Sequence, residues 1–137
     1  MKARFLVDKS ALARMSIEAV RGRLGPLIEE GLAATCGVIE LEVLYSARNR
    51  AAYEEIRSRR ALAYEWVPID DGVLRRALDV QRLLARKGHH RIPIPDLIIA
   101  AAAERAGMTV LHYDADYDTI AKATGQSTEW VVPRGTL

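Results

Sequence analysis

Short apolar runs alternate with segments of helical periodicity along the chain. Apolar runs of about four to eight residues, bounded by polar or turn-forming residues, predict buried strands. These predicted strands cover 3–8, 33–36, 63–70, 108–113 and 129–132. The segments between them predict helices over 10–21, 27–31, 38–48, 50–61, 72–87, 97–107 and 114–125. This alternation predicts an α/β fold of three layers, with a central, mostly parallel sheet flanked by helices.

Local signals place several of these helix ends. Ser10 is the expected N-cap of the first helix, and Gly25–Pro26 is expected to separate it from the second. The segment HHRIPIPD (89–96) predicts a loop stiffened by its prolines. Gly107 is expected to close the helix that precedes it.

Composition is that of an ordinary globular protein. The chain has 137 residues, of which 50% are hydrophobic and 28% charged, with a formal net charge of +2. We expect a single domain spanning 1–137, because this length buries a substantial core. The single cysteine, Cys36, lies in an apolar stretch and is expected in the core. The start lacks the apolar region of a signal peptide, and no segment has the length of a membrane span, so a cytoplasmic location is expected.

Arginine is concentrated in a few short segments. The clearest are SARNR (46–50), RSRR (57–60) and ARKGHHR (85–91). Because the guanidinium group suits phosphate recognition, these segments are compatible with a polyanionic partner. They are equally compatible with a solvated helix surface, and charge alone does not decide between the two.

Three aspartates fall at the edges of predicted elements. Asp8 ends the first apolar run, Asp114 follows TVLHY, and Asp96 precedes seven consecutive apolar residues, 97–103. In open parallel sheets, ligands gather at the carboxyl ends of the strands. Each aspartate could instead cap a helix, a role worth about 1 kcal/mol.

Two glutamates interrupt the apolar segment VIELEVLY (38–45). Glu42 has apolar neighbours one turn before it, where an unpaired carboxylate is costly. Because a helix advances about 100° per residue, Glu40 and Glu42 point in different directions. We expect Glu42 to point inward and Glu40 outward or into an interface. The alternative for Glu42 is a buried ion pair with an arginine such as Arg14.

The segment HYDADYDTI places three carboxylates within five residues. Asp118 is expected to pair with Lys122 on a helix surface, whereas Asp114 and Asp116 have no local positive partner. Grouped carboxylates raise one another's pKa unless a cation neutralises them. Hard oxygen ligands favour Mg²⁺ or Mn²⁺, and the three histidines form no zinc pattern. The hypothesis is that these acids converge on one or two divalent ions.

Four segments together carry a family resemblance. LVDKSAL, IELEVLYSA, IPDLIIAAAA and LHYDADYDTIA resemble, in order and over nearly the whole chain, the four acidic motifs of PIN domains. More narrowly, the chain resembles the VapC toxins of bacterial VapBC toxin–antitoxin systems.

The resemblance implies a Mg²⁺-dependent endoribonuclease, with Mn²⁺ able to substitute, that cleaves tRNA or other structured RNA through attack of a metal-activated water. It also implies inhibition by a cognate VapB antitoxin, homodimers, and hetero-oligomers with that antitoxin. By position, the catalytic and metal-binding acids are Asp8, Glu42, Asp96 and Asp114, with Asp116 as an accessory metal ligand. Lys9 departs from the family pattern, which has a small hydroxyl residue there, while the typical Ser10 is present.

Two other functions would fit parts of the pattern. A phosphoacceptor signalling domain also places acids at strand ends, but it needs paired acids after the first strand and a lysine after a late one. Asp8 is followed by Lys9, and HYDAD contains no lysine. A binding module without catalysis would use the acids as caps and the arginines for binding, since fold alone does not establish activity. Metal-dependent cleavage of RNA distinguishes the enzyme from this module.

Overall fold

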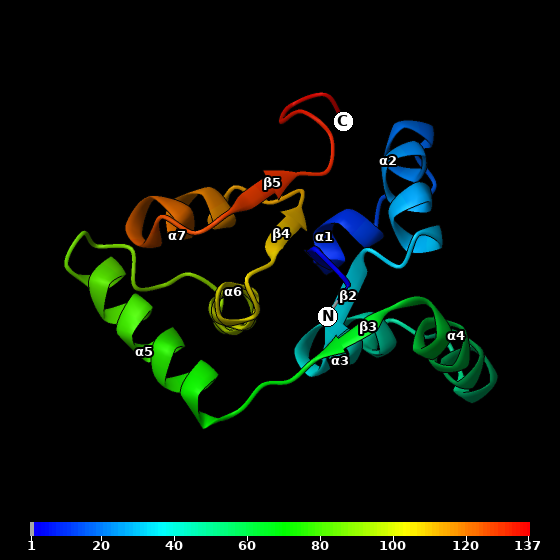
Figure 1. Ribbon diagram of the computed structural model, residues 1–137, viewed down its shortest axis with the longest axis horizontal. Coiled ribbons are helices and arrows are strands. Elements are labelled where there is room, and N and C mark those ends of the chain that lie inside the picture. The colour runs from blue at the N-terminus through cyan, green and yellow to red at the C-terminus, as the bar shows by residue number, and fades with distance from the viewer. Residues whose placement is uncertain (1) are drawn as a thin grey trace.

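The computed structural model describes residues 2–137 and contains one five-stranded parallel sheet in the order β3-β2-β1-β4-β5 (Figure 1). All four strand pairings are parallel, as the alternation of strands and helices predicts. The strands are β1 (Phe5–Val7), β2 (Ala33–Cys36), β3 (Glu65–Val67), β4 (Thr109–His112) and β5 (Thr128–Trp130).

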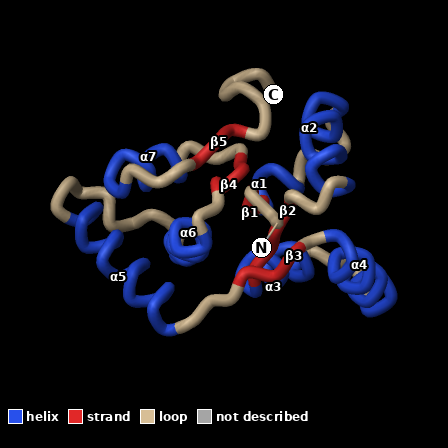
Figure 2. The backbone as a smooth tube through the Cα atoms, in the orientation of Figure 1, coloured by secondary structure: helices blue, strands red, loops and turns tan. Residues whose placement is uncertain are grey.

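Helices connect the strands and cover the sheet (Figure 2). They are α1 (Lys9–Leu12), α2 (Glu18–Glu29), α3 (Gly37–Tyr45), α4 (Arg50–Ala63), α5 (Asp71–Ala85), α6 (Ile94–Ala106) and α7 (Asp116–Thr124). None of the helices within residues 2–137 is both long and apolar enough to cross a membrane.

Each face of the sheet has its own hydrophobic core. Side chains alternate along a strand, so Leu6 and Val7 of β1 point to opposite faces. Leu6 packs in a buried cluster with residues of α3, α5, α6 and α7, whereas Val7 packs with residues of α1 and α2. Cys36 lies in the first of these clusters and is fully buried, which confirms its expected place in the core.

The strand order reverses between β1 and β4. Leu6 is paired with Val110 and Val7 with Leu111, so the two strands end side by side. The connections from β1 and β4 leave in opposite directions along the sheet, which opens a crevice at the carboxyl ends of these two strands. Residues that immediately follow β1 and β4 are therefore brought together.

The segment after β1 differs from the prediction of one helix over 10–21. A four-residue helix, α1, begins at Lys9, and its N-cap is Asp8, whose Oδ2 accepts a 3.0 Å hydrogen bond from the Ser10 backbone. The longer α2 then continues through Pro26, so the predicted break at Gly25–Pro26 is wrong. Gly25 has no Cβ to clash with the proline ring, and Leu24 is fully buried, which holds this turn helical.

Other elements begin or end a few residues away from their predicted boundaries. Helix α6 begins at Ile94, inside the segment predicted to be a loop, because Pro95 lies in the first turn where no backbone donor is required. This places Asp96 in the first turn of α6. Gly107 ends α6 with φ at 70°, as predicted. Strand β3 is shorter than the predicted 63–70.

Candidate acidic site

Four of the predicted acids line one cavity of about 280 Å³ at the crevice between β1 and β4. Asp8 follows β1, Asp114 follows β4, Asp96 comes from α6 and Glu42 from α3. The other lining residues are Lys9, Ser10, Ala13 and Arg14. Segments distant in sequence therefore bring these carboxylates to one place, as the sequence predicted.

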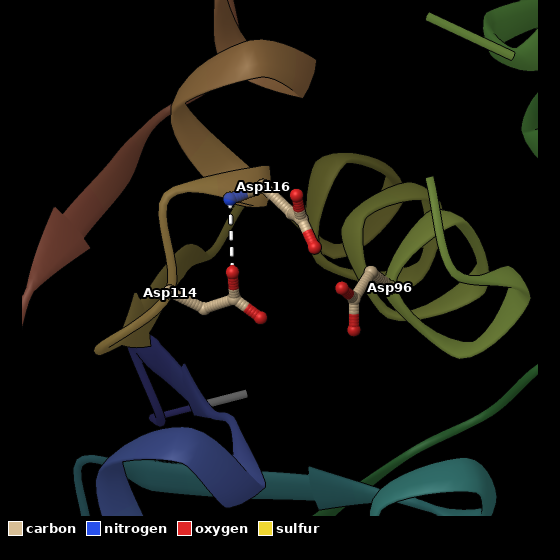
Figure 3. Close-up of side chains that lie close together, drawn as sticks. All are labelled: Asp96, Asp114 and Asp116. Atoms are coloured by element: carbon tan, nitrogen blue, oxygen red, sulfur yellow. Dashed lines mark hydrogen bonds between the residues drawn. The ribbon is translucent and has the colours of Figure 1, made fainter. Parts of the chain in front are cut away.

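Asp116 joins this group from the start of α7. One carboxylate oxygen from each of Asp96, Asp114 and Asp116 lies within 4.8 Å of the others, and the side chains point toward a common space (Figure 3). The Asp116 backbone also donates a 2.9 Å hydrogen bond to Oδ1 of Asp114. A set of converging carboxylate oxygens, with no sulfur or imidazole ligand among them, fits a hard divalent cation.

Asp8 is both a helix cap and part of the site. Its Oδ2 accepts the backbone hydrogen bond from Ser10, and its Oδ1 accepts a 2.8 Å hydrogen bond from the Tyr117 hydroxyl. Only 4% of Asp8 is exposed. The capping alternative is therefore correct for Asp8, and it does not exclude the predicted role, because the capping bond fixes the carboxylate at the cavity wall.

Two further hydrogen bonds order the end of β4, and the first of them also joins it to the segment after β1. The Tyr113 backbone donates a 2.9 Å hydrogen bond to Oγ of Ser10, which ties the start of α1 to the end of β4. The Asp114 backbone donates a 3.1 Å hydrogen bond to Nδ1 of His112. Burial lowers the pKa of His112, consistent with a neutral ring whose Nδ1 accepts this bond. His112 thus has a positioning role that its place within a strand did not suggest.

The carboxylates of the site destabilise one another's charge. Burial and the nearby charges of Asp8, Asp114, Asp116 and Glu42 raise the pKa of Asp96 to about 7. Burial, followed by the charge of Asp8, raises the pKa of Glu42. Burial and contact with Asp114 raise the pKa of Asp116. Such a cluster is poorly compensated by the protein alone and is suited to a bound cation.

The two glutamates of α3 do point in different directions. Glu40 was expected to point outward or into an interface, and it lies half-buried against Arg60 of α4. Glu40 forms an ion pair with Arg60, whose Nε and Nη2 donate hydrogen bonds of 2.9 and 2.8 Å to the Glu40 carboxylate. Thr35 donates another. Glu42 is half-buried at the cavity and forms no ion pair with Arg14 or any other basic residue within 2–137. The ion-pair partner of Glu40 is therefore an arginine of α4, twenty residues further along the chain.

Asp118 does not pair with Lys122. Its carboxylate accepts a hydrogen bond of 3.1 Å from Trp130 Nε1 and lies 3.7 Å from Arg134 Nη1. Strand β5 and the segment after it bring these partners close, so the spacing of four residues within α7 was misleading. Sequence reasoning also missed Tyr117, which is fully buried beneath the site. Its signal was a tyrosine in an apolar position of α7 directly after Asp116.

An open parallel sheet with carboxylates at its switch point defines an α/β domain with an acidic, cation-binding type of site. Residues 5–123 match the model of the PIN domain. The chain is 49% identical over 137 residues to "Ribonuclease VapC21" of Mycobacterium tuberculosis, with 99% of each covered. It is 44% identical to "Ribonuclease VapC51" of the same species, with 100% of this chain and 99% of that one covered. The chain belongs to the PIN-domain family, in its VapC branch.

Solved structures have the same fold at lower sequence identity. A DNA-bound VapBC from Salmonella typhimurium superposes with a TM-score of 0.73 at 18% identity, covering 95% of this chain and 99% of that one. VapBC2 from Rickettsia felis, bound to a DNA fragment from its promoter, gives a TM-score of 0.76 at 13% identity, with 92% and 97% covered. The predicted fold class is thereby confirmed.

Proposed function

We propose that this protein is a VapC-type toxin that cleaves RNA internally and depends on a divalent metal ion. The observation that carries the proposal is the convergence of Asp8, Glu42, Asp96 and Asp114 on one cavity. The curated relatives named as ribonucleases support RNA as the substrate. We propose tRNA or another structured RNA as the target.

Five carboxylates would hold the metal between them. The carboxylate oxygens of Asp96, Asp114 and Asp116 lie close enough together that they would bind one ion. Asp8 and Glu42 line the same cavity and would bind the ion directly or through a water molecule. Mg²⁺ is the proposed ion and Mn²⁺ its substitute, because both accept oxygen ligands. When bound, such an ion stabilises negative charge on the phosphate and lowers the pKa of a nearby water.

Glu42 is the proposed general base. Burial raises its pKa, so its carboxylate is a stronger base than an exposed glutamate. Among residues 2–137 it has no hydrogen-bond donor that would compete for its lone pairs, unlike Asp8 and Glu40. It would accept the proton of the water whose oxygen attacks phosphorus. The bond from phosphorus to O3′ breaks and O3′ takes up a proton, which leaves a 5′-phosphate and a 3′-hydroxyl.

The proposed protein partner is a VapB-type antitoxin. Solved VapBC and toxin–antitoxin complexes contain a chain with the same fold, which supports this assignment. We propose that the toxin forms homodimers and assembles with the antitoxin into hetero-oligomers. Antitoxin must therefore be removed before activity is assayed.

The test is cleavage of total bacterial RNA by antitoxin-free protein in Mg²⁺ or Mn²⁺. Asp8→Asn and Asp96→Asn remove site carboxylates, and Asp71→Asn is the matched control, since Asp71 lies on α5 with 78% of its side chain exposed. We expect discrete metal-dependent fragments with 5′-phosphates from the wild type and the control. The site variants should lose more than about 100-fold in rate, because loss of a supporting group alone costs ~10–100-fold. Equal cleavage by all four proteins would refute the proposal.

A further inference from the structure

The cavity that holds the acids also has two cations on its wall, Lys9 and Arg14. The same cavity is lined by the acids Glu42, Asp96 and Asp114. Within residues 2–137, neither cation lies in an ion pair with a carboxylate, although six other ion pairs form across the protein. Both cations are half-buried beside the acids, so their positive charges act on the same space as the carboxylates.

Arg14 is held in a defined position. Its Nη1 donates a 2.7 Å hydrogen bond to the Ser10 carbonyl, and its guanidinium carbon lies 4.7 Å from the centroid of the Tyr113 ring. Both contacts come from segments that flank the site, after β1 and β4. They use one guanidinium donor and one face, and the remaining N–H groups stay available for an anion in the planar arrangement that suits phosphate.

Lys9 places a second positive charge next to the acids. It directly follows Asp8, is half-buried at the cavity, and its charge lowers the pKa of Glu42 against the larger effect of burial. An ammonium group on a flexible stem binds phosphate as a point charge, without the directional match of arginine. Lys9 and Arg14 therefore supply one adaptable and one oriented cation.

An RNA strand that reaches this site brings several phosphates close to five carboxylates. The phosphate under attack is neutralised by the bound cation, but its neighbours along the strand meet acidic groups that repel them. We propose that Lys9 and Arg14 form a phosphate-binding subsite for a nucleotide next to the cleaved bond. This inference rests on the proposed ribonuclease function and names which residues orient its substrate.

The test is RNA binding in a cleavage-deficient Asp96→Asn background, so that binding is measured without turnover. The probe is a short single-stranded RNA with a 5′-fluorescein, followed by anisotropy over a series of KCl concentrations. Lys9→Gln and Arg14→Gln each remove one charge. Arg75→Gln is the matched control, because Arg75 lies on α5 with 78% of its side chain exposed and, among residues 2–137, forms an ion pair with Asp71 alone.

We expect Arg14→Gln to weaken RNA binding about 5–10-fold at low salt and Lys9→Gln to weaken it less. Each lost phosphate contact should reduce the slope of log affinity against log salt by about 0.7 for a single strand. Arg14→Lys should recover part of the affinity but not all of it, which a merely structural role would not predict. Mn²⁺ affinity, measured by electron paramagnetic resonance in the wild-type background, should not fall in either variant.

Three results would overturn the subsite. The first is an unchanged affinity and salt slope in both variants. The second is an equal loss in Arg75→Gln, which would indicate non-specific attraction. The third is unchanged RNA binding with weaker capture of the antitoxin, which would assign these cations to the protein partner. If the wild type itself cuts no RNA, the proposed ribonuclease function fails, whereas the three results above concern binding alone and do not contradict that function.

Discussion

The hydroxyl of Tyr117 lies between two carboxylates of the site. It donates a 2.8 Å hydrogen bond to Oδ1 of Asp8, 109 residues away, and lies 3.4 Å from Oδ1 of Asp96. Tyr117 is fully buried, and burial raises its pKa well above the usual value, so the hydroxyl keeps its proton. The Tyr117 hydroxyl therefore orients the Asp8 carboxylate and separates it from the Asp96 carboxylate.

Tyr117→Phe tests that role, because phenylalanine keeps the ring and removes only the hydroxyl. We expect Mn²⁺ affinity and RNA cleavage to fall about 10-fold, the range typical of losing a group that orients a metal ligand. Electron paramagnetic resonance of Mn²⁺ and the cleavage rate at saturating Mn²⁺ give the two readouts. A variant that binds Mn²⁺ like the wild type would show that Asp8 is oriented by its capping bond alone.

The raised pKa of Asp96 predicts how the metal-free protein responds to pH. Because the folded-state pKa, about 7, is above the ordinary value of 3.8, folding favours the protonated acid. This contribution to stability is complete below about pH 4 and is lost as pH rises through 7. We expect the free energy of unfolding to fall by a few kcal/mol between pH 5 and 8, on the order of 1.4 kcal/mol per pKa unit. Thermal unfolding in a chelating buffer measures it.

Asp96→Asn is the control for this pH dependence. Asparagine stays neutral, so the metal-free variant should be more stable than the wild type at pH 8 and should lose much of the decline. Divalent metal should restore stability at pH 8 to the wild type and much less to the variant. If the two proteins show the same pH profile without metal, Asp96 is not the group responsible.

Asp114 and Asp116 are expected to differ in importance. Asp114 lines the cavity, and its carboxylate accepts a hydrogen bond from the backbone of Asp116 at the start of α7. Asp116 contributes one of the converging carboxylate oxygens but does not line the cavity. Asp114→Asn should therefore reduce cleavage more than Asp116→Asn, by about 10-fold between the two variants. Cleavage rates across a Mn²⁺ titration provide the comparison, and the reverse order would make Asp116 the more important ligand.

The sequence was sufficient for the fold class and for the residues at the ends of strands. Asp8 and Asp114 were predictable because parallel strands end at one edge, whichever way their side chains pack. The inward direction of Glu42 was predictable from its apolar neighbours in the helix. The partner of Glu40 was not, because it is Arg60 from α4, a different helix. Tyr117 escaped notice because a buried hydroxyl between two acids has no local pattern. Pro26 was misleading because tertiary burial of Leu24 outweighed the local break.

The ion pair of Glu40 and Arg60 provides a prediction about folding, separate from catalysis. Only 17% of the Glu40 side chain and 10% of the Arg60 side chain are exposed, and the guanidinium also lies 4.4 Å from the Tyr64 ring. Glu40→Gln leaves Arg60 charged in a buried place, so the free energy of unfolding should fall by about 3 kcal/mol. Urea denaturation at pH 7 measures the loss.

Glu40→Gln combined with Arg60→Met should recover most of the lost stability, because no unpaired charge remains. RNA cleavage by the folded fraction should be unchanged in both variants. An equal or greater loss in the double variant would mean that the pair itself, rather than the unpaired charge, determines stability here.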